Sequence, residues 1–441
     1  MRFLHRILCL AAIGGGLLPT PARPAVEIEY WLWDSGQLPA YRAAANVFEQ
    51  ANPDIKVRIT QVWWTDYWIS LTTSFLSESG PDVFTNHPGK FPEFAVNGTL
   101  LDLAPLVARD RVDTSVYVDG LYSAWGQGPR QFGLPKDWDA IALVYNRTML
   151  ERAGVQPAEL ETLDWNPRDG GSFARMLARL TLDAAGENAL SPRFDPRQIR
   201  QYGLLVDGRT DGFGQLEWSH FAASNGFVCQ DAPWSGRFHY DDPRLAETLT
   251  WLRDAQQRGI IIPAAQVRQI DASGLFAAEK GALVLTGSWL INWFTRGVKF
   301  PFGFAPLPSG PVGRKTMVNG LADSIWVGTR HPEQAWRWVR FLGSPEAQLI
   351  IAEHGVVFPA VRTASTRAAA VMSRKAPGVT AFLDAATTPN GTFPYPIAKR
   401  GSDLQQLGLA AMDRIFLDRA DIPATLRKLD QDVRRLFEAK R

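Results

Sequence analysis

The segment from Gly133 to Val155, GLPKDWDAIALVYNRTMLERAGV, constrains the fold of this chain more than any other. The polar cluster Asp137–Asp139 directly precedes an apolar run over 141–145, which has the length of a buried strand. Asn146 is a residue type that caps helix N-termini, and Gly154 is typical of a helix end. The segment therefore predicts a strand followed at once by a helix, with two carboxylates and an indole at one end of the strand. Open α/β sheets bind their ligands at strand ends.

The rest of the chain repeats this alternation of strands and helices. Strands spaced by helices of about 10 to 15 residues imply a parallel or mixed sheet covered on both faces. The 441 residues are too many for one compact core and indicate two lobes of roughly 150 to 200 residues each. The strands predicted with most support cover 28–33, 55–62 and 202–206, and the helices cover 38–50, 66–79, 218–225 and 244–258.

The N-terminus has the pattern of a secretory signal peptide. Arg2 and Arg6 precede an apolar segment over 7–18, which small residues follow. At about 12 residues this segment is too short to span a bilayer. We therefore predict a signal peptide over 1–25 and a soluble periplasmic protein. Cys9 lies inside the apolar segment, too early for a lipid-modified cysteine, so no lipid anchor is expected.

Charge and motif content narrow the function classes. The net charge of +2 falls to about zero without Arg2 and Arg6, so no nucleic-acid footprint is expected. The six histidines lack metal-ligand spacing, and no nucleophile elbow or phosphate-binding loop occurs. We predict no metal, no cofactor and no catalytic residues. Cys229 is the only cysteine beyond the signal peptide, and a small buried side chain is its expected role.

Tryptophan and carboxylate side chains occur together at several strand ends. An indole can stack on the C–H face of a sugar ring while a carboxylate accepts hydroxyl hydrogens. Trp33 and Asp34 end the first strand, and Trp64 and Asp66 follow the second. The alternative is that these aromatic residues only fill the space between sheet and helices. That alternative is preferred for Trp68 and Trp293.

Several segments in order along the chain resemble the family 1 extracellular solute-binding proteins, the sugar receptors of ABC importers. They include "YWLWDSG", "NGTLLDLAPLV", "GLP" leading to "YN" and "AGV", "TGSW" and "VNGLADSIWVGT". The resemblance implies an α/β fold of the type II periplasmic-binding-protein kind, with a ligand cleft between two lobes that are each a mixed sheet flanked by helices. By the same resemblance the N-terminal lobe comprises 26–140 and 305–345, and the C-terminal lobe comprises 141–304 and 346–441.

The resemblance also implies site residues. Asp139 matches a ligand carboxylate near the hinge, and Trp289 matches an indole that follows a glycine, here Gly287. We expect Asp139 to have an ordinary pKa near 4 and to be ionised at neutral pH. The predicted ligand-binding residues are Trp33, Asp34, Trp64, Asp66, Asn86, Asp139, Trp218, Trp289, Gly320 and Tyr395.

The function predicted is that of a monomeric receptor that captures a mono- or oligosaccharide and delivers it to the transmembrane permease of an ABC importer. A secreted glycoside hydrolase stays open, because carboxylates beside indoles also describe a glycosidase cleft. A receptor for an anionic solute such as a phosphorylated polyol is the other alternative. It would use Lys136, Lys90 or Arg130.

Overall fold

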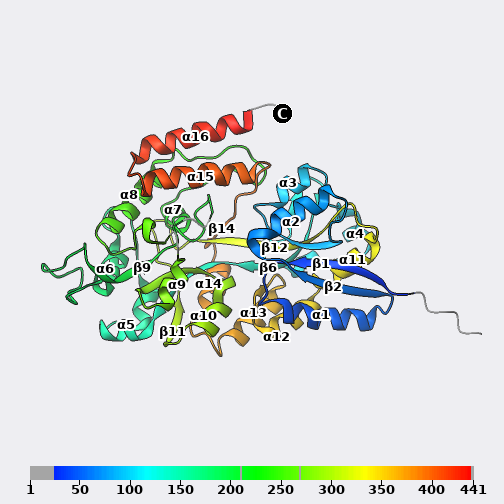
Figure 1. Cartoon of the computed structure of the whole chain (residues 1–441), viewed down its shortest axis with the longest axis horizontal. Coiled ribbons are helices and arrows are strands. Elements are labelled where there is room, and N and C mark those ends of the chain that lie inside the picture. The colour runs from blue at the N-terminus through cyan, green and yellow to red at the C-terminus, as the bar shows by residue number, and fades with distance from the viewer. Residues whose placement is uncertain (1–23, 209–210, 268–269, 439–441) are drawn as a thin grey trace, which may run out of the picture.

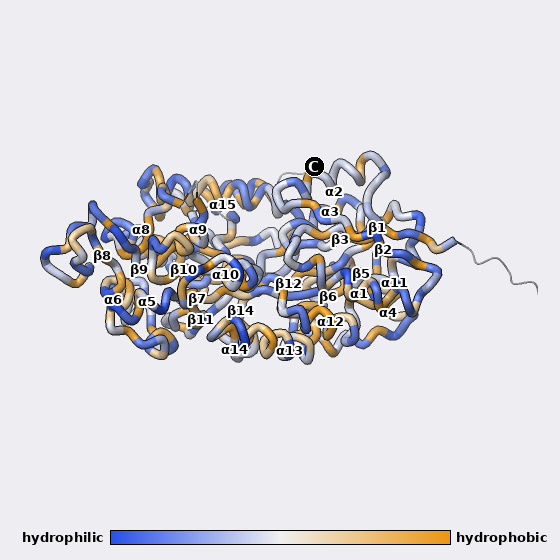
Figure 2. Tube along the Cα trace, turned by 60° about the horizontal axis from the view of Figure 1, so that its bottom comes forward, coloured by the Kyte–Doolittle hydropathy of each residue, from blue (hydrophilic) through white to orange (hydrophobic). Residues whose placement is uncertain are grey.

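The computed structural model describes residues 24–208, 211–267 and 270–438, and most of the predicted signal peptide lies outside these ranges. The described chain forms two lobes side by side, each built around its own sheet (Figure 1). Hydrophobic segments concentrate around the strands of both sheets (Figure 2). The predicted fold class, two α/β lobes with mixed sheets flanked by helices, is confirmed.

The first sheet has the strand order β13-β6-β12-β3-β1-β2, with β14 paired to β12. Strand β1 runs parallel to β2 and β3, whereas β12 runs antiparallel to β3 and β6. Apolar residues alternate along β1 and β2, as expected for strands with one face on the core. The strands are β1 (Val26–Leu32), β2 (Ile55–Gln61), β3 (Val83–Asn86), β6 (Leu134–Asp139), β12 (Thr316–Ile325), β13 (Phe358–Pro359) and β14 (Thr392–Pro394).

Helices cover both faces of this sheet. One core joins β1 and β2 to α1 and α11, and a second, mostly aromatic core joins β3 to α2 and α3. The bounds are α1 (Leu38–Ala51), α2 (Trp64–Leu76), α3 (Phe91–Val96), α4 (Ala104–Arg109), α11 (Pro332–Leu342) and α12 (Pro345–His354), and a hairpin joins β4 (Gly126–Gln127) to β5 (Arg130–Gln131).

The second sheet has the order β11-β7-β10-β9-β8. Its central strands β7 and β10 are buried at every position, which explains their continuous apolar sequences. The strands are β7 (Ile141–Asn146), β8 (Leu182–Asp183), β9 (Ile199–Leu205), β10 (Gly281–Gly287) and β11 (Phe302–Ala305). The helices are α5 (Arg147–Arg152), α6 (Gly171–Leu180), α7 (Ser219–Ser224), α8 (Pro243–Gln257), α9 (Ala272–Ala277), α10 (Ile291–Gly297), α13 (Arg362–Met372), α14 (Thr380–Thr387), α15 (Gly401–Phe416) and α16 (Ile422–Glu438).

The segment that most constrained the prediction folds largely as expected. β7 leads directly into α5, whose first turn is capped by Asn146 through a 3.1 Å hydrogen bond from the Met149 amide. The polar cluster that precedes β7, however, is itself strand β6. Alternation along β6 turns the Trp138 indole away from the carboxylates, onto the ring of Phe358 at 4.8 Å. The expectation of an indole beside the two carboxylates is therefore wrong for Trp138.

Ala140 alone separates β6 of the first sheet from β7 of the second, and β11 leads back to β12. The Ile141 amide of β7 donates to Thr316 Oγ1 of β12 at 2.8 Å, so the two sheets approach each other at these connections. Helix α12 packs on α1, and β13 pairs with β6, so the first sheet also takes residues beyond 345. The domain boundaries themselves stay predictions.

Two further findings concern surfaces. Among the helices of the described ranges, none is both long and apolar enough to cross a membrane. Trp293 is 39% exposed on α10, so its predicted core position is wrong, because it occupies the outer side of that short helix. Trp68 is half-buried and packs against the aromatic core of the first lobe.

Candidate functional site

An acidic cluster is formed by the half-buried Asp34, which follows β1, and by the buried Asp137 and Asp139, at the end of β6 where it meets β7. Asp137 and Asp139 are 1% and 6% exposed, and the charge of Asp34 acts on the pKa of both. Lys136 Nζ lies 3.2 Å from Asp137 Oδ2, donates to Gln37 Oε1 and sits 4.2 Å above the ring of Tyr41. These partners hold the ammonium group inside the first lobe.

Asp139 is the member of the cluster that links the two sheets. Its Oδ1 accepts a 2.6 Å hydrogen bond from Ser288 Oγ, at the end of β10 in the second sheet. Burial raises the pKa of Asp139 to about 8, and the nearby Asp137 charge adds to this. The expectation of an ordinary pKa is wrong, because the sequence did not show that the carboxyl would be buried beside other carboxylates.

Asp323, on β12, is a further buried carboxyl group close enough to Asp137 for that charge to act on its pKa. It accepts hydrogen bonds from Tyr30 Oη at 2.8 Å and Thr85 Oγ1 at 3.2 Å. Burial raises its pKa to about 7, although the Lys136 charge opposes this. The first lobe thus holds two buried carboxyl groups, Asp139 and Asp323, that bind protons close to neutral pH.

Trp33, which precedes Asp34 in the chain, packs with Trp64 and Trp68. We call these three residues the tryptophan wall. The ring centroids of Trp33 and Trp64 are 5.1 Å apart, and those of Trp64 and Trp68 are 5.4 Å apart, both edge-to-face. Trp64 also meets the His87 ring at 5.6 Å. Trp64 is 46% exposed in spite of these contacts, so part of its indole is free to stack on a ligand.

His87 and Asn319 connect the tryptophan wall to the acidic cluster. Burial, reinforced by Lys90, lowers the pKa of His87 to about 3, so the ring is neutral. Its Nδ1 accepts the Gly89 amide hydrogen at 3.1 Å, which places the ring proton on Nε2. Nε2 lies 2.8 Å from Asn319 Nδ2, and because Nε2–H is itself a donor, the Asn319 amide oxygen must take this position to accept from it. Asn319 is paired with Asp139 across β6 and β12.

Tyr395 and Trp289 lie on the side of this region that faces the core of the second lobe. The Tyr395 ring lies 5.2 Å from His87 and 5.2 Å from Phe213. Trp289 follows Ser288, the partner of Asp139, and its indole lies so close over Gly287 that a Cβ there would be 2.0 Å from it. Gly287 is thus required for this indole position. The contacts join five predicted residues into one region, namely Trp33, Asp34, Trp64, Asp139 and Tyr395, and Trp289 adjoins this region in the chain through Ser288.

The other four predicted residues lie elsewhere or face inward. The Asn86 amide is fully buried and bonds Ser324 Oγ and the His87 amide. Trp218 is 2% exposed and packs over Gly214. A Cβ on Gly320 would meet Leu121 at 2.6 Å, and Asp66 is exposed in the first turn of α2.

Sequence reasoning missed His87, Asn319, Ser288 and Gln37. His87 follows Asn86, and a strand that ends at Asn86 turns the next side chain to the sheet edge, a signal that was present in the sequence. Ser288 adjoins Trp289 in the sequence, and no local pattern shows that its hydroxyl reaches Asp139. Gln37 and Asn319 meet Lys136 and His87 only through the fold, over separations of 99 and 232 residues.

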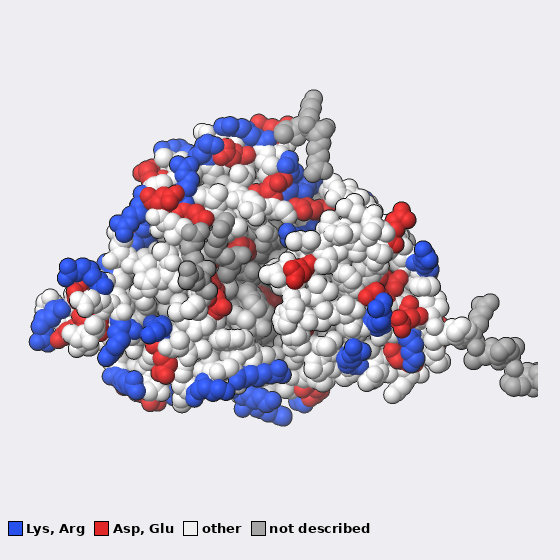
Figure 3. Space-filling view, viewed as in Figure 1, with Lys and Arg blue, Asp and Glu red and all other residues white. Residues whose placement is uncertain are grey.

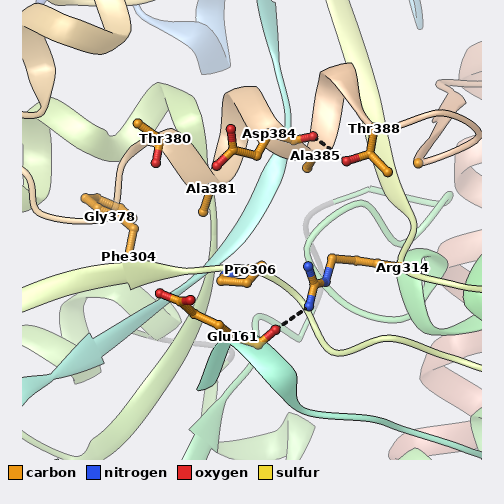
Figure 4. Close-up of a pocket in the computed structure, with 11 residues that line it drawn as sticks. Glu161, Phe304, Pro306, Arg314, Gly378, Thr380, Ala381, Asp384, Ala385 and Thr388 are labelled. Carbon is orange, nitrogen blue, oxygen red and sulfur yellow. Dashed lines mark hydrogen bonds between the residues drawn. The ribbon is translucent and has the colours of Figure 1, made fainter. Parts of the chain in front are cut away.

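The surface is hollowed between the two lobes, and acidic side chains are visible inside the hollow (Figure 3). A separate cavity of about 330 Å³ lies beside α14 on the second lobe (Figure 4). Arg314, on its wall, donates to the carbonyl oxygens of Glu161 and Leu307, so its charge is directed at the backbone. None of the ten predicted ligand-binding residues lines this cavity.

None of the three basic residues that an anionic ligand would use has a free ammonium or guanidinium group in the region. Lys136 is buried on Gln37, Asp137 and Tyr41. Lys90 donates to Ser402 Oγ, and the exposed Arg130 lies over Phe132 and bonds Gln127. Among the described residues, no group of three or more His, Cys, Asp and Glu side chains is arranged to hold a metal ion.

The family model of bacterial extracellular solute-binding proteins matches residues 34–349. The match covers well over half of the chain, and the chain belongs to this family. A curated relative, an uncharacterized ABC transporter extracellular-binding protein of Pyrococcus horikoshii, is 21% identical over 78% of this chain and 74% of its own length.

Solved structures give the same class. The chain is similar to UspC of M. tuberculosis, with a TM-score of 0.74 and 28% identity over 92% of this chain and 99% of that one. It is also similar to the ABC substrate-binding protein Lmo0181 of Listeria monocytogenes, solved in complex with cycloalternan, with a TM-score of 0.79 and 19% identity over 94% and 100% of the two chains. The second likeness shows the fold.

Proposed function

We propose that this protein is the receptor of an ABC importer for a saccharide, which it binds between its lobes and releases unchanged to a transmembrane permease. The observation that carries the proposal is the meeting of the tryptophan wall with the acidic cluster. An exposed indole face and acceptor oxygens match the two faces of a sugar, its C–H surface and its hydroxyl groups.

The proposed site takes residues from both lobes, which supports a mechanism in which the lobes close on the ligand. Trp33, Asp34 and Trp64 belong to the first lobe, and Trp289 belongs to the second. Ser288 bonds Asp139 where the chain passes between the sheets. A ligand held by residues of both lobes favours the closed arrangement, because it gains all its contacts only there. Export by a signal peptide to the periplasm without a lipid anchor, and a monomeric state, are parts of the same proposal.

A neutral saccharide fits this region better than an anionic solute. The acidic cluster repels a phosphate group, and Lys136 already serves Asp137 and Gln37. Moving Lys136 Nζ to a phosphate would leave Asp137 as an uncompensated buried charge.

One observation favours the glycoside hydrolase as a second candidate. Asp139, with a pKa raised to about 8, can keep a proton at neutral pH as a general acid does. We assign it to binding, because the family relatives that are named for a function are binding proteins.

The test is a thermal-shift screen of the purified protein against neutral oligosaccharides, sugar phosphates and polyols, followed by titration calorimetry of the hits. We expect a neutral saccharide to bind with a dissociation constant around micromolar, about −8 kcal/mol. Chromatography of the ligand after prolonged incubation should return it intact. Hydrolysis products that disappear in Asp139→Asn would establish the hydrolase, and a phosphate requirement would establish the anionic-solute receptor.

A further inference from the structure

Trp234 holds an unusual backbone conformation. It lies in the segment 230–238 between α7 and α8 of the second lobe, and its φ is +69°, in the left-handed region. Non-glycine residues with bulky side chains enter this region only when surrounding contacts compensate the strain. The contacts around Trp234 therefore need an explanation.

The Trp234 side chain docks on the first lobe. Its Nε1 donates a 2.7 Å hydrogen bond to the Gly126 carbonyl oxygen, and its ring meets Phe91 edge-on at 5.3 Å. It packs against the aromatic core that contains Phe91 and Trp125. The segment around it stays fixed to the second lobe, because Phe238 is buried in the core of that lobe and stacks on Phe437 of α16 at 6.0 Å.

A second contact between the lobes lies next to Trp234. Helix α15 begins beside α3 (Figure 1). The Ser402 amide donates to Glu93 Oε1 at 2.8 Å, and Ser402 Oγ donates to Glu93 Oε2 at 3.0 Å. Lys90 Nζ donates to the same Oγ at 3.0 Å. Glu93 thus accepts two hydrogen bonds at the positive end of a long helix.

We propose that Trp234 and Ser402 form a latch that holds the lobes together before any ligand is bound. The chain connections at Ala140 and between β11 and β12 persist whether the lobes are open or closed. The latch contacts are noncovalent and join α3 and Gly126 to the segment 230–238 and α15, so they separate when the lobes part.

The strain at Trp234 gives the latch a second property. Phe91 and Gly126 hold the docked side chain, and the Trp234 amide donates to the Ile397 carbonyl oxygen at 2.7 Å, so release of the indole leaves this one backbone bond to hold the left-handed conformation. The latched and released arrangements are therefore distinct states, and the latch sets how much of the protein is closed without ligand.

The test uses the whole mature protein without ligand, so its outcome does not depend on which solute is bound. Small-angle X-ray scattering measures the radius of gyration, and hydrogen–deuterium exchange measures protection of α3 and of 230–238. The variants are Trp234→Ala, Ser402→Ala and, as a matched control, Trp293→Ala, which removes an exposed indole outside the interface. We expect both latch variants to raise the radius of gyration, and exchange in both segments to rise by at least about tenfold, with the control unchanged.

If Trp234→Ala fails to fold by circular dichroism, Ser402→Ala and Trp234→Phe replace it, since Phe keeps a six-membered aromatic ring to pack on Phe91 and lacks the donor to Gly126. If these variants have the same radius of gyration and the same hydrogen–deuterium exchange as the wild type, the latch proposal is wrong. Faster exchange confined to 230–238, with α3 still protected and the radius of gyration unchanged, would also overturn it, because Trp234 would then only order its own segment.

Discussion

The acidic cluster and the tryptophan wall lie side by side in the proposed site, yet they are built in opposite ways. Asp137 and Asp139 are almost fully buried, and the cluster accepts hydrogen bonds from Lys136, Ser288 and the Gly36 amide, whereas Asp137 Oδ1 is buried without a partner. The wall is aromatic, and Trp64 keeps nearly half of its surface in solvent. The cluster therefore contributes to both fold and binding, whereas Trp64, the exposed member of the wall, is free to contribute mainly to binding, since Trp33 and Trp68 also pack on the core.

The largest expected effect is on stability, at the cluster. Asp137→Ala leaves the Lys136 ammonium buried with only Gln37 as a polar partner, and we expect a loss of about 3 to 5 kcal/mol in the free energy of unfolding. Urea denaturation measures it. Asp66→Ala, an exposed carboxylate on α2, is the control and should stay within about 0.5 kcal/mol. A small loss of unfolding free energy in Asp137→Ala would mean that the Lys136 ammonium group becomes hydrated in the variant.

The wall should respond in affinity. Trp64→Ala removes a half-exposed stacking surface, so we expect roughly 1 to 3 kcal/mol less binding free energy for the saccharide found by screening, with a loss of stability below that of a buried aromatic truncation. Calorimetry and denaturation measure the two. Trp138→Ala, from a fully buried indole on β6, should reverse the pattern with about 3 to 5 kcal/mol of stability lost. Equal stability losses in both variants would remove the contrast.

The pKa of Asp139 predicts how ligand affinity depends on pH. Its pKa is about 8 in the free protein, and ligand hydroxyl groups that donate to it favour the ionised form. Affinity should therefore rise from pH 6 to pH 8, by up to about tenfold per pH unit, and level off above pH 8. Titration calorimetry across this range measures the rise, and Asp139→Asn should abolish it. Affinity that falls with rising pH would show that protonated Asp139 donates to the ligand.

The pH dependence of stability is the remaining test of the acidic cluster and of Asp323. The folded-state pKa values of Asp139, about 8, and Asp323, about 7, lie above the unfolded value of 3.8. The native state then holds more protons than the unfolded state between about pH 4 and pH 8, and stability falls as pH rises through that window. We expect the melting temperature to drop by a few degrees from pH 5.5 to pH 8. Asp323→Asn should reduce the drop, and a melting temperature that rises with pH would contradict both assignments.

The sequence alone determined the class and the outline of this protein. Strand and helix periodicity predicted β1, α1, β2, β7 and α8 to within a few residues, because burial on a sheet or helix face leaves a local record in the order of apolar side chains. The same local signals gave the Asn146 cap and the close approach over Gly287. The ordered landmarks of the family supplied the two-lobe architecture.

Tertiary structure alone decided which polar groups share a site and in what state. Lys136 meets Gln37, His87 meets Asn319, and Asp139 meets Ser288 over separations of 99 to 232 residues. The raised pKa of Asp139 and the lowered pKa of His87 follow from burial, which no spacing within one segment records. Trp138 and Trp64 have the same side chain beside similar polar residues, and only the packing of β6 and α2 made one interior and left the other exposed. Charge state and exposure depend on neighbours brought from distant segments, and for that reason the fold had to be known before the site could be described.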